Sequence, residues 1–167
     1  MDGVTVAPAS VDRIDELTDF WLQLHRYQGA LSAAIPGVPL RNDEDTGPLV
    51  RALYIEWMTQ PDSFAFVAEL DGKPVGYVLG FVQEPSEMWD TGRIGHIDSF
   101  LVTPEARGKG VGSLLLEKVY DHLGRIGVRT VGLDVVSRNE GARRFYEREG
   151  FVPTLLHMYR ALPENLS

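Results

Sequence analysis

The chain of 167 residues contains no cysteine. It therefore forms no disulfide, supplies no thiolate to a metal ion and has no cysteine nucleophile. Its four histidines include no closely spaced H-x-x-x-H pair, and the G-x-S-x-G turn of serine hydrolases is absent. We therefore expect neither a metal site nor a nucleophile elbow.

Positive charge is also in short supply. Lysine and arginine number 16 against 24 aspartates and glutamates, which gives a net charge of −8 and a pI near 4.9. Because a surface that binds nucleic acid must be cationic, we expect no nucleic acid partner. An acidic surface is compatible with a cationic or amine substrate.

Long apolar runs are missing as well. No stretch is long enough to span a membrane, and Met1 is not followed by a basic-then-apolar leader. We expect no membrane partner and a soluble, cytoplasmic protein. With 44% hydrophobic residues and no shift in composition, residues 1–167 should form a single domain with a sizeable core.

What the sequence does contain is a strand, a glycine-rich loop and a helix in immediate succession. Ile97–Val102 has the β-branched and apolar residues of a buried strand, and Pro104 ends it. The loop R-G-K-G-V-G at 107–112 then opens an apolar-periodic helix. Glycines let backbone N–H groups turn inward, and the first helical turn adds unpaired donors and a positive dipole end. With Arg107 and Lys109 beside these donors, the loop is predicted to bind phosphate.

The glycine spacing separates several kinds of phosphate loop. A nucleoside-triphosphate loop needs four residues between its first glycine and Gly-Lys-Ser/Thr, and a dinucleotide loop needs G-x-G-x-x-G. Gly108, Gly110 and Gly112 give G-x-G-x-G instead. The remaining alternative is an ordinary strand–helix connection that happens to be rich in glycine.

Hydrophobic periodicity and turn signals predict the order β-α-α-β-β-β-α-β-α-β. Asp71-Gly72 is a type I′ hairpin signal between two of the strands. The order predicts an α/β (α+β) fold with a mixed central sheet and helices on both faces. The expected strands are 4–8, 63–70, 73–82, 97–102, 128–136 and 151–162, the last as one strand or a pair. The expected helices run from about 10, over 49–58, over 110–123 and from 139 to a cap at Gly150.

Two segments resemble the signatures of the GCN5-related N-acetyltransferase (GNAT) superfamily. The loop at 107–112 resembles Q/R-x-x-G-x-G/A, and F-L-V-T-P at 100–104 resembles the family's L-x-V-x-P strand end, with Phe100 in place of the usual leucine. The pattern N-x-x-A-x-x-F-Y-x-x-x-G-F at 139–151 resembles the second signature. The resemblance is strong over 96–151 and weak before about residue 60, and it implies the GNAT acyl-CoA N-acyltransferase fold.

The resemblance further implies that the glycine-rich loop holds the pyrophosphate of acetyl-coenzyme A (acetyl-CoA). It implies that Asn139 contacts the pantetheine arm and that Tyr146 lies near the thioester sulfur. The residues expected to bind the cofactor are Phe100, Leu101, Val102, Arg107, Gly108, Lys109, Gly110, Val111, Gly112, Ser113, Asn139 and Tyr146.

Direct transfer of an acetyl group to an amine needs an acid, a base and an oxyanion donor. Tyr146, with an ordinary pKa of ~10, is expected to protonate the leaving thiolate, and the resemblance implies that a backbone N–H within Phe100–Val102 meets the oxyanion. Asp98 and His96 lie two apart, so we expect them on one face of the strand as candidate bases. The alternatives are a purely packed Tyr146, structural roles for Asp98 and His96, and a water chain as the base.

The resemblance implies that the acceptor contacts the variable parts of the family, here the first helices and the loop before the strand at 97–102. A helical aromatic such as Trp21 also suits a core. The acidic loop residues favour a small cationic amine, and the resemblance also implies a homodimer. The residues selected for the substrate site are Trp21, His25, Tyr27, Trp89 and Asp98, with Glu84, Glu87 and Asp90 as further candidates.

The leading hypothesis is an acetyl-CoA-dependent N-acetyltransferase that transfers the acetyl group directly to a primary amine of a small molecule or a peptide, in a ternary complex. Two alternatives stay open at this point. One is a GNAT-like module that binds acyl-CoA without catalysis. The other is an acyltransferase that uses a longer acyl chain or a hydroxyl acceptor.

Overall fold

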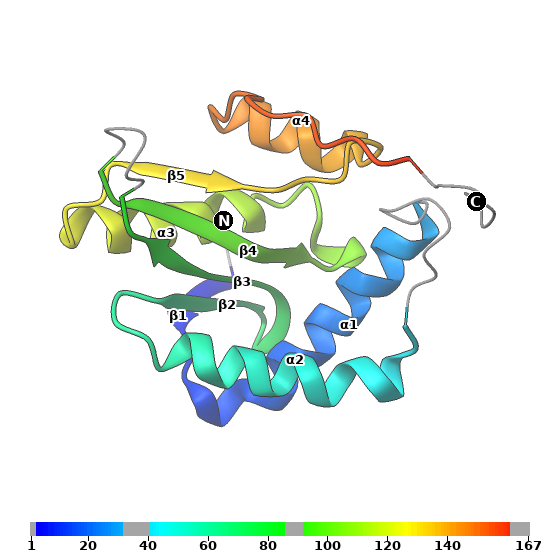
Figure 1. Cartoon of the computed structure of the whole chain (residues 1–167). Coiled ribbons are helices and arrows are strands. Elements are labelled where there is room, and N and C mark those ends of the chain that lie inside the picture. Colours follow the sequence, from blue (N-terminus) through cyan, green and yellow to red (C-terminus); the bar gives the residue numbers. More distant parts are fainter. Residues whose placement is uncertain (1–2, 32–40, 86–91, 161–167) are drawn as a thin grey trace.

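The computed structural model describes residues 3–31, 41–85 and 92–160 (Figure 1). Short 3-10 turns precede α1 and follow β4. In chain order the strands and α-helices are β1 Val4–Pro8, α1 Ile14–Ala30, α2 Asp43–Met58, β2 Phe64–Leu70, β3 Lys73–Gln83, β4 Ile94–Val102, α3 Val111–Arg125, β5 Thr130–Leu133 and α4 Glu140–Arg148.

The strands form one sheet in the order β1-β2-β3-β4-β5. The first four strands are antiparallel neighbours, and β5 pairs with β4 in parallel. At the β2–β3 hairpin, Asp71 and Gly72 have φ angles of 52° and 76°, both positive as the predicted type I′ turn requires. The mixed sheet expected from the sequence is confirmed.

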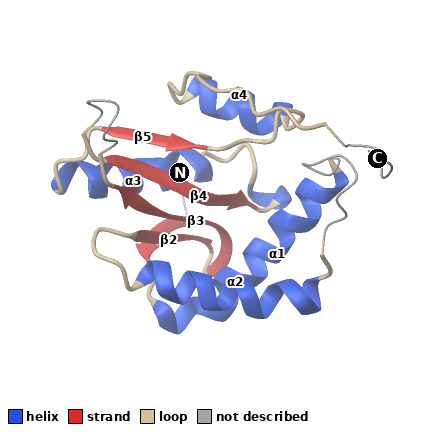
Figure 2. Ribbon diagram, viewed as in Figure 1, coloured by secondary structure: helices blue, strands red, loops and turns tan. Residues whose placement is uncertain are grey.

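Helices cover both faces of this sheet (Figures 1 and 2). On one face α1 and α2 pack against a core that includes Val67, Tyr77 and Leu101. On the other face α3 packs against a core that includes Val78 and Ile97. The α4 helix lies on the far side of β5 from β4 (Figure 1). The predicted α/β class, with helices on both faces, is confirmed.

Strand β4 contains one extra residue, Asp98. Ile97 and Ser99 pair with consecutive residues of β3, so Asp98 between them has no partner there. Such a β-bulge breaks the alternation of side chains between the two faces of a sheet. Ile97 accordingly belongs to the core under α3, whereas Leu101 belongs to the core under α1 and α2.

The parallel pairing of β4 with β5 ends at Ile97 and Leu133. Beyond that point β4 continues to Val102 and stays paired with β3. Because its pairing with β4 stops at Leu133, β5 is only four residues long, Thr130–Leu133, and not the predicted 128–136. Strands β4 and β5 separate after Ile97, and among the described residues the rest of β4 has no strand partner on that edge.

The start of α2 also differs from the prediction. The helix begins at Asp43 and not near Leu49 because Asn42 caps it, with the Asn42 side chain accepting a hydrogen bond from the Asp45 N–H at 2.8 Å. Acidic residues fill the first turn, where the helix dipole favours them. Pro48 lies inside the helix and does not mark its beginning.

The stretch after α4 is the third difference. The helix ends as predicted: Gly150 has a φ of 93°, and the Phe151 N–H bonds the Tyr146 carbonyl at 2.9 Å. The strand predicted at 151–162 is wrong over 151–160, which form no strand, and residues 161–162 lie outside the described residues. An apolar run becomes a strand only where a neighbouring strand offers hydrogen bonds, and no described strand pairs with it.

Gly80 of β3 pairs with Ile97 next to the bulge. A Cβ at Gly80 would stand 2.2 Å from the His96 carbonyl oxygen and 2.3 Å from the Phe64 ring. We therefore predict that Gly80→Ala lowers the free energy of unfolding by about 1–3 kcal/mol, as overpacking of a core does, and lowers the midpoint of urea unfolding. Gly132→Ala is the matched control because a Cβ there meets no atom within 4 Å. A wild-type midpoint for Gly80→Ala would contradict this packing.

Candidate active site

The loop predicted to bind phosphate forms the entrance to α3. Gly108 and Gly110 have φ angles of 74° and 77°, in the left-handed region that favours glycine. Gly110 is the N-cap residue of α3, no side chain caps the first turn, and that turn contains no acidic residue. The first N–H groups of α3 are therefore available to an anion at the positive end of the helix dipole. The loop fits the pyrophosphate predicted for it.

Arg107 is held beside this loop by two contacts. Its Nε donates to the Val102 carbonyl at 3.1 Å, and its guanidinium carbon lies 5.4 Å from the centre of the Tyr27 ring. The second contact is a cation–π interaction. Tyr27, predicted to contact the substrate, thus reaches the phosphate loop from α1. Arg107 forms no ion pair with a described residue, so its remaining N–H groups can face a phosphate.

The other predicted cofactor residues differ in what they expose. The side chains of Leu101 and Val111 are only 6% and 1% exposed, so a cofactor would meet their backbone alone. Ser113 Oγ donates to Glu149 Oε1 at 2.6 Å and ties the start of α3 to the end of α4. Gly112 lets these helices approach, because a Cβ there would stand 2.9 Å from the Phe145 ring.

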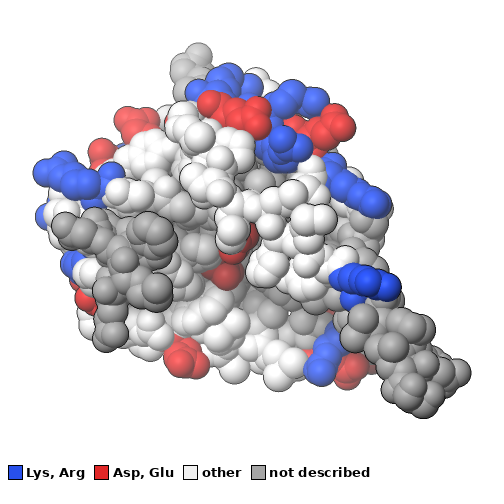
Figure 3. All heavy atoms as spheres, turned by 45° about the horizontal axis from the view of Figure 1, so that its top comes forward, with Lys and Arg blue, Asp and Glu red and all other residues white. Residues whose placement is uncertain are grey.

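A cleft lies where β4 and β5 separate. Its walls come from α1, β4, the end of β5 with the residues after it, and α4. Figure 3 shows acidic atoms in a recess near the middle of one face, surrounded by uncharged residues. The cleft brings residues of two distant sequence motifs into one site. The lining residues are Leu24, Gln28, Ile97, Asp98, Phe100, Leu133, Asp134, Val135, Val136, Asn139, Ala142 and Tyr146.

Tyr146 faces the cleft from α4. Its ring packs among those of Phe100, Phe145 and Phe151, at centroid distances of 6.0, 5.2 and 5.5 Å. Burial raises the pKa of its hydroxyl above the ordinary value of 10.0. The hydroxyl therefore stays protonated at neutral pH and can act as a proton donor.

Asp98 reaches the same cleft from the bulge, and its side chain keeps contact with solvent. Burial raises the pKa of its carboxyl above 3.8; a hydrogen bond from Ser99 Oγ and the charge of His96 lower it, and Asp134 raises it. The Ser99 Oγ–Asp98 Oδ2 distance is 2.6 Å. The carboxylate is therefore a stronger base than that of an ordinary aspartate.

His96 does not line the cleft. Its ring packs against Phe81, with centroids 5.3 Å apart, and Phe81 in turn contacts Trp57 of α2 at 5.2 Å. The expectation that His96 and Asp98 share a face assumed a regular strand, and the bulge at Asp98 removes that basis. The charge of His96 nevertheless acts on the Asp98 carboxyl.

Asn139 is the N-cap of α4, and its side-chain oxygen accepts a hydrogen bond from the Ala142 N–H at 3.2 Å. It therefore fixes the start of α4 while it lines the cleft. Its predicted contact with the pantetheine arm stays a prediction.

The predicted substrate residues of α1 lie elsewhere. Trp21 and His25 stack on each other at 4.7 Å, the His25 Nε2 lies 3.2 Å from the Arg41 carbonyl oxygen, and neither residue lines the cleft. Glu84 pairs with Arg93 at 3.6 Å. The other candidates from the loop before β4 lie outside the described residues: Glu87, Trp89 and Asp90.

The acceptor was expected against the first helices, but the residues selected on α1 were Trp21, His25 and Tyr27, and the segment after β5 was given no role. Leu24 and Gln28, the two residues of α1 that line the cleft, were not among those selected. Asp134 fell inside the predicted strand 128–136, because the early end of β5 was not foreseen. A carboxylate between the apolar residues Leu133 and Val135 was the available signal.

A second hollow, of about 350 Å³, lies between β1, β2 and α3. Lys118, His122 and Arg125 of α3 border it, and none of the motif residues lines it. Among the described residues no three histidine or acidic side chains gather as metal ligands would. In the same part of the chain no helix has the length and apolar character needed to cross a bilayer.

The chain belongs to the acetyltransferase (GNAT) family, whose family model matches residues 30–151. Over 99 residues it is 35% identical to an N-acetyltransferase of Methanocaldococcus jannaschii, a match that covers 59% of this chain and 43% of that relative. Over 145 residues it is 31% identical to the mycothiol acetyltransferase of Acidimicrobium ferrooxidans, covering 87% and 43%. The chain matches only part of the length of such relatives: 43% and 56% of two N-acetyltransferases of Methanocaldococcus jannaschii and 63% of one of Archaeoglobus fulgidus.

Solved structures share the fold along almost the entire chain. The GCN5-related N-acetyltransferase of Ralstonia eutropha JMP134 superimposes with a TM-score of 0.75 at 18% identity, covering 96% of this chain and 99% of that one. AAC(6′)-Iy in complex with a bisubstrate analogue superimposes with a TM-score of 0.70 at 16% identity, covering 96% and 98%. At these identities the likeness establishes the fold, and the GNAT fold predicted from the sequence is confirmed.

The raised pKa of Asp98 has a consequence for stability. A carboxyl whose pKa rises on folding binds its proton more tightly in the folded state, so the free energy of unfolding falls as pH rises from the unfolded value of about 3.8 through the folded value. We therefore predict that Asp98→Asn raises the melting temperature at pH 7, where the wild-type carboxylate is charged. The difference should vanish below about pH 3.8, where both side chains are neutral.

Melting curves between pH 3 and pH 8 measure this difference. Asp121→Asn on the exposed side of α3 removes the same net charge outside the cleft and is the matched control. A lower melting temperature for Asp98→Asn than for the wild type at pH 7 would contradict the assigned direction of the pKa shift.

Proposed function

We propose that the protein transfers an acetyl group from acetyl-CoA directly to a primary amine. The observation that carries this proposal is the cleft at the separation of β4 and β5, where a proton donor, Tyr146, and a carboxylate, Asp98, both line the opening. Membership of the acetyltransferase (GNAT) family supports the same activity. A predicted acetyltransferase of Clostridium acetobutylicum, solved with acetyl-CoA, superimposes with a TM-score of 0.72.

The cofactor would be held at two places. The backbone N–H groups after Gly110, with Arg107 beside them, suit the pyrophosphate. Asn139 and Phe100 line the cleft in which the pantetheine arm would lie. Acetyl-CoA supplies the acetyl thioester, in which the bond from carbon to sulfur breaks as the bond from carbon to the amine nitrogen forms.

The residues of the cleft divide the proton transfers between them. Asp98 accepts the proton that the amine loses, since its raised pKa makes it a stronger base. Tyr146 donates a proton to the leaving sulfur, since burial keeps its hydroxyl protonated. A backbone N–H on the unpaired edge of Phe100–Val102 donates to the developing oxyanion, and such a donor needs no reorganisation during the reaction.

The acceptor we propose is a small cationic amine. Two carboxyl groups, those of Asp98 and Asp134, line the cleft and attract an ammonium group. A relative named for an amine of this class supports the proposal. It is the L-2,4-diaminobutyric acid acetyltransferase of Nocardia farcinica, which is 33% identical over 75 residues. A soil metagenome aminoglycoside acetyltransferase in complex with sisomicin has a TM-score of 0.67.

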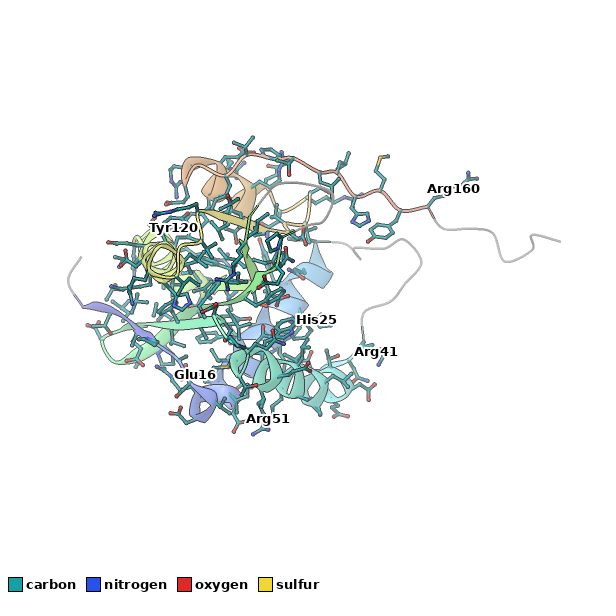
Figure 4. The ribbon with its side chains drawn as sticks, turned by 60° about the vertical axis from the view of Figure 1, so that its left-hand side comes forward. Glu16, His25, Arg41, Arg51, Tyr120 and Arg160 are labelled. Atoms are coloured by element: carbon teal, nitrogen blue, oxygen red, sulfur yellow. The ribbon has the colours of Figure 1, made fainter. Side chains whose placement is uncertain are left out.

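We also propose that the protein forms a homodimer through the segment after α4. Val152, Leu155, Leu156 and Met158 are 77%, 84%, 70% and 81% exposed, so this segment leaves apolar surface uncovered. Figure 4 shows the segment leading away from the body of the molecule, with Arg160 at its outer end. The β5 strand is at the edge of the sheet, so β5 of a second chain could pair with this segment.

Tyr146→Phe tests catalysis separately from cofactor binding. We predict that acetyl-CoA at a hundredfold excess over its Kd stabilises both wild type and variant by ~2.7 kcal/mol, measured by thermal melting with ATP as the negative control. Acetyl transfer to an amine library, followed by thiol release, should fall about a hundredfold or more in the variant because the general acid is lost.

Tyr120→Phe, on the exposed side of α3, is the matched control and should keep the wild-type rate. A wild-type melting temperature that does not change with millimolar acetyl-CoA would contradict the proposed cofactor. A Tyr146→Phe variant that keeps the wild-type rate would contradict the role of Tyr146, and a wild type that binds acetyl-CoA without any thiol release would favour the non-catalytic module.

Light scattering tests the homodimer. We predict a mass twice the 18.6 kDa of one chain for the wild type and a single-chain mass for Leu156→Glu. Leu49→Glu, which changes a leucine of α2 that is 57% exposed, is the matched control and should stay dimeric. A wild-type mass of one chain at tens of micromolar protein would contradict the proposal.

A further inference from the structure

Three buried hydroxyl groups form a chain that ends at Asp98. Tyr77 of β3, Tyr54 of α2 and Ser99 of β4 are 0%, 1% and 2% exposed. The Tyr54 hydroxyl lies 3.0 Å from that of Tyr77 and 2.7 Å from Ser99 Oγ, and Ser99 Oγ lies 2.6 Å from Asp98 Oδ2. Elements far apart in the sequence thus converge on one carboxylate.

The protons in this chain all point the same way. Tyr54 donates to Ser99, and Ser99 donates to Asp98. A hydroxyl carries a single proton, so Tyr54 can only accept from Tyr77. Burial raises the pKa of both tyrosines, which keeps their hydroxyls protonated. The carboxylate therefore accepts the last bond of a polarised chain, an arrangement in which each bond strengthens the next.

The bulge makes this arrangement possible. Ser99 is on the side of the sheet that faces α1 and α2, where Tyr54 reaches it, whereas its neighbour Asp98 reaches the cleft. In a regular strand the two side chains would point to opposite faces. The bulge brings the Ser99 hydroxyl onto the adjacent carboxylate and links the core under α2 to the cleft.

Packing alone does not require these hydroxyls. Around them the core is apolar, and the Phe20 ring stacks on Tyr77 at a centroid distance of 5.3 Å. Buried polar groups are unfavourable unless they are paired, and an apolar core of the same volume is often as stable. The chain of hydroxyls ends on a group that lines the cleft, which points to a role there.

We propose that Ser99 and Tyr54, supported by Tyr77, are positioning residues that fix the carboxylate of Asp98 in the orientation in which it accepts the proton of the amine. This inference rests on the proposed function, in which Asp98 is the base. The polarised hydroxyl chain favours the charged carboxylate, so loss of the chain makes Asp98 a weaker acid that is protonated at higher pH.

Other groups near Asp98 also affect the pKa of its carboxyl or line the same cleft. His96 on the same strand lowers the pKa of its carboxyl, and Asp134 after β5 raises it. Tyr146 of α4 lines the same cleft, as does the neutral Gln28 of α1. The substitutions below leave these groups in place, so a change in titration reports the hydroxyl chain.

The test compares Ser99→Ala, Tyr54→Phe and Tyr77→Phe in the full chain. The acidic limb of kcat/KM against pH should move upward by about one unit in Ser99→Ala, which corresponds to ~1.4 kcal/mol. The shift should be smaller in Tyr54→Phe, at about half a unit, and smallest in Tyr77→Phe, because each hydroxyl lies one bond further from the carboxylate. Carbon NMR titration of the Asp98 carboxyl without cofactor should show the same order, independent of activity.

Tyr120→Phe, at the exposed position labelled in Figure 4, is the matched control and should leave the limb unmoved. Unmoved limbs and unmoved Asp98 titrations in Ser99→Ala and Tyr54→Phe, with lower melting temperatures alone, would overturn the proposal and show a structural role. Asp98→Asn distinguishes failure of this inference from failure of the proposed function. If that variant keeps full activity and is still stabilised by acetyl-CoA, Asp98 is not the base and this inference fails. Acetyl transfer as the proposed function would then still stand.

Discussion

The site depends on the loss of pairing between β4 and β5 beyond Ile97 and Leu133. A sheet that stayed paired to Val102 would fill its own edge with hydrogen bonds and leave no opening. Because the strands separate, a cleft forms between them, Tyr146 reaches it from α4, and backbone groups of β4 lose their strand partners on that side. The same strand then continues directly into the turn and the loop that open α3. The end of the β4–β5 pairing therefore places the expected oxyanion donor and the proton donor at one opening, from which β4 leads to the phosphate loop.

The bulge at Asp98 is the second constraint, and it acts on side chains. It moves Ile97 to the core under α3 and Leu101 to the core under α1 and α2, so β4 serves both cores. It also sets Ser99 and Asp98 side by side, so that a buried hydroxyl supports a carboxylate in the cleft. The close approach of Gly80 to the His96 carbonyl lies next to this irregularity, where a larger residue would not fit.

Features encoded by neighbouring residues could be predicted from the sequence. The glycine-rich loop, the hairpin at Asp71-Gly72 and the cap at Gly150 depend on local backbone conformation, and each appears where expected. The prediction that Asn139 and Tyr146 share a cofactor site with the loop came from the family resemblance. The start of α2 was expected near Leu49, whereas the Asn42 cap and the acidic first turn place it at Asp43.

What could not be predicted depends on contacts between distant residues. The bulge follows from the register of β3 against β4, so the expected common face for His96 and Asp98 rested on a regularity that β4 lacks. The stretch 151–160 has the composition of a strand but pairs with no described strand. The hydroxyl chain joins residues 54, 77 and 99, and no local pattern links them.

Backbone hydrogen exchange with and without acetyl-CoA tests whether the cofactor lies at the opening between β4 and β5. If the thioester lies at the opening between β4 and β5, acetyl-CoA should slow exchange at amides of residues 99–102 and 107–113. Exchange around the separate hollow beside Lys118 and Arg125 should stay the same. Unchanged exchange at both β4 and the loop, or protection confined to that hollow, would show that acetyl-CoA does not bind between β4 and β5.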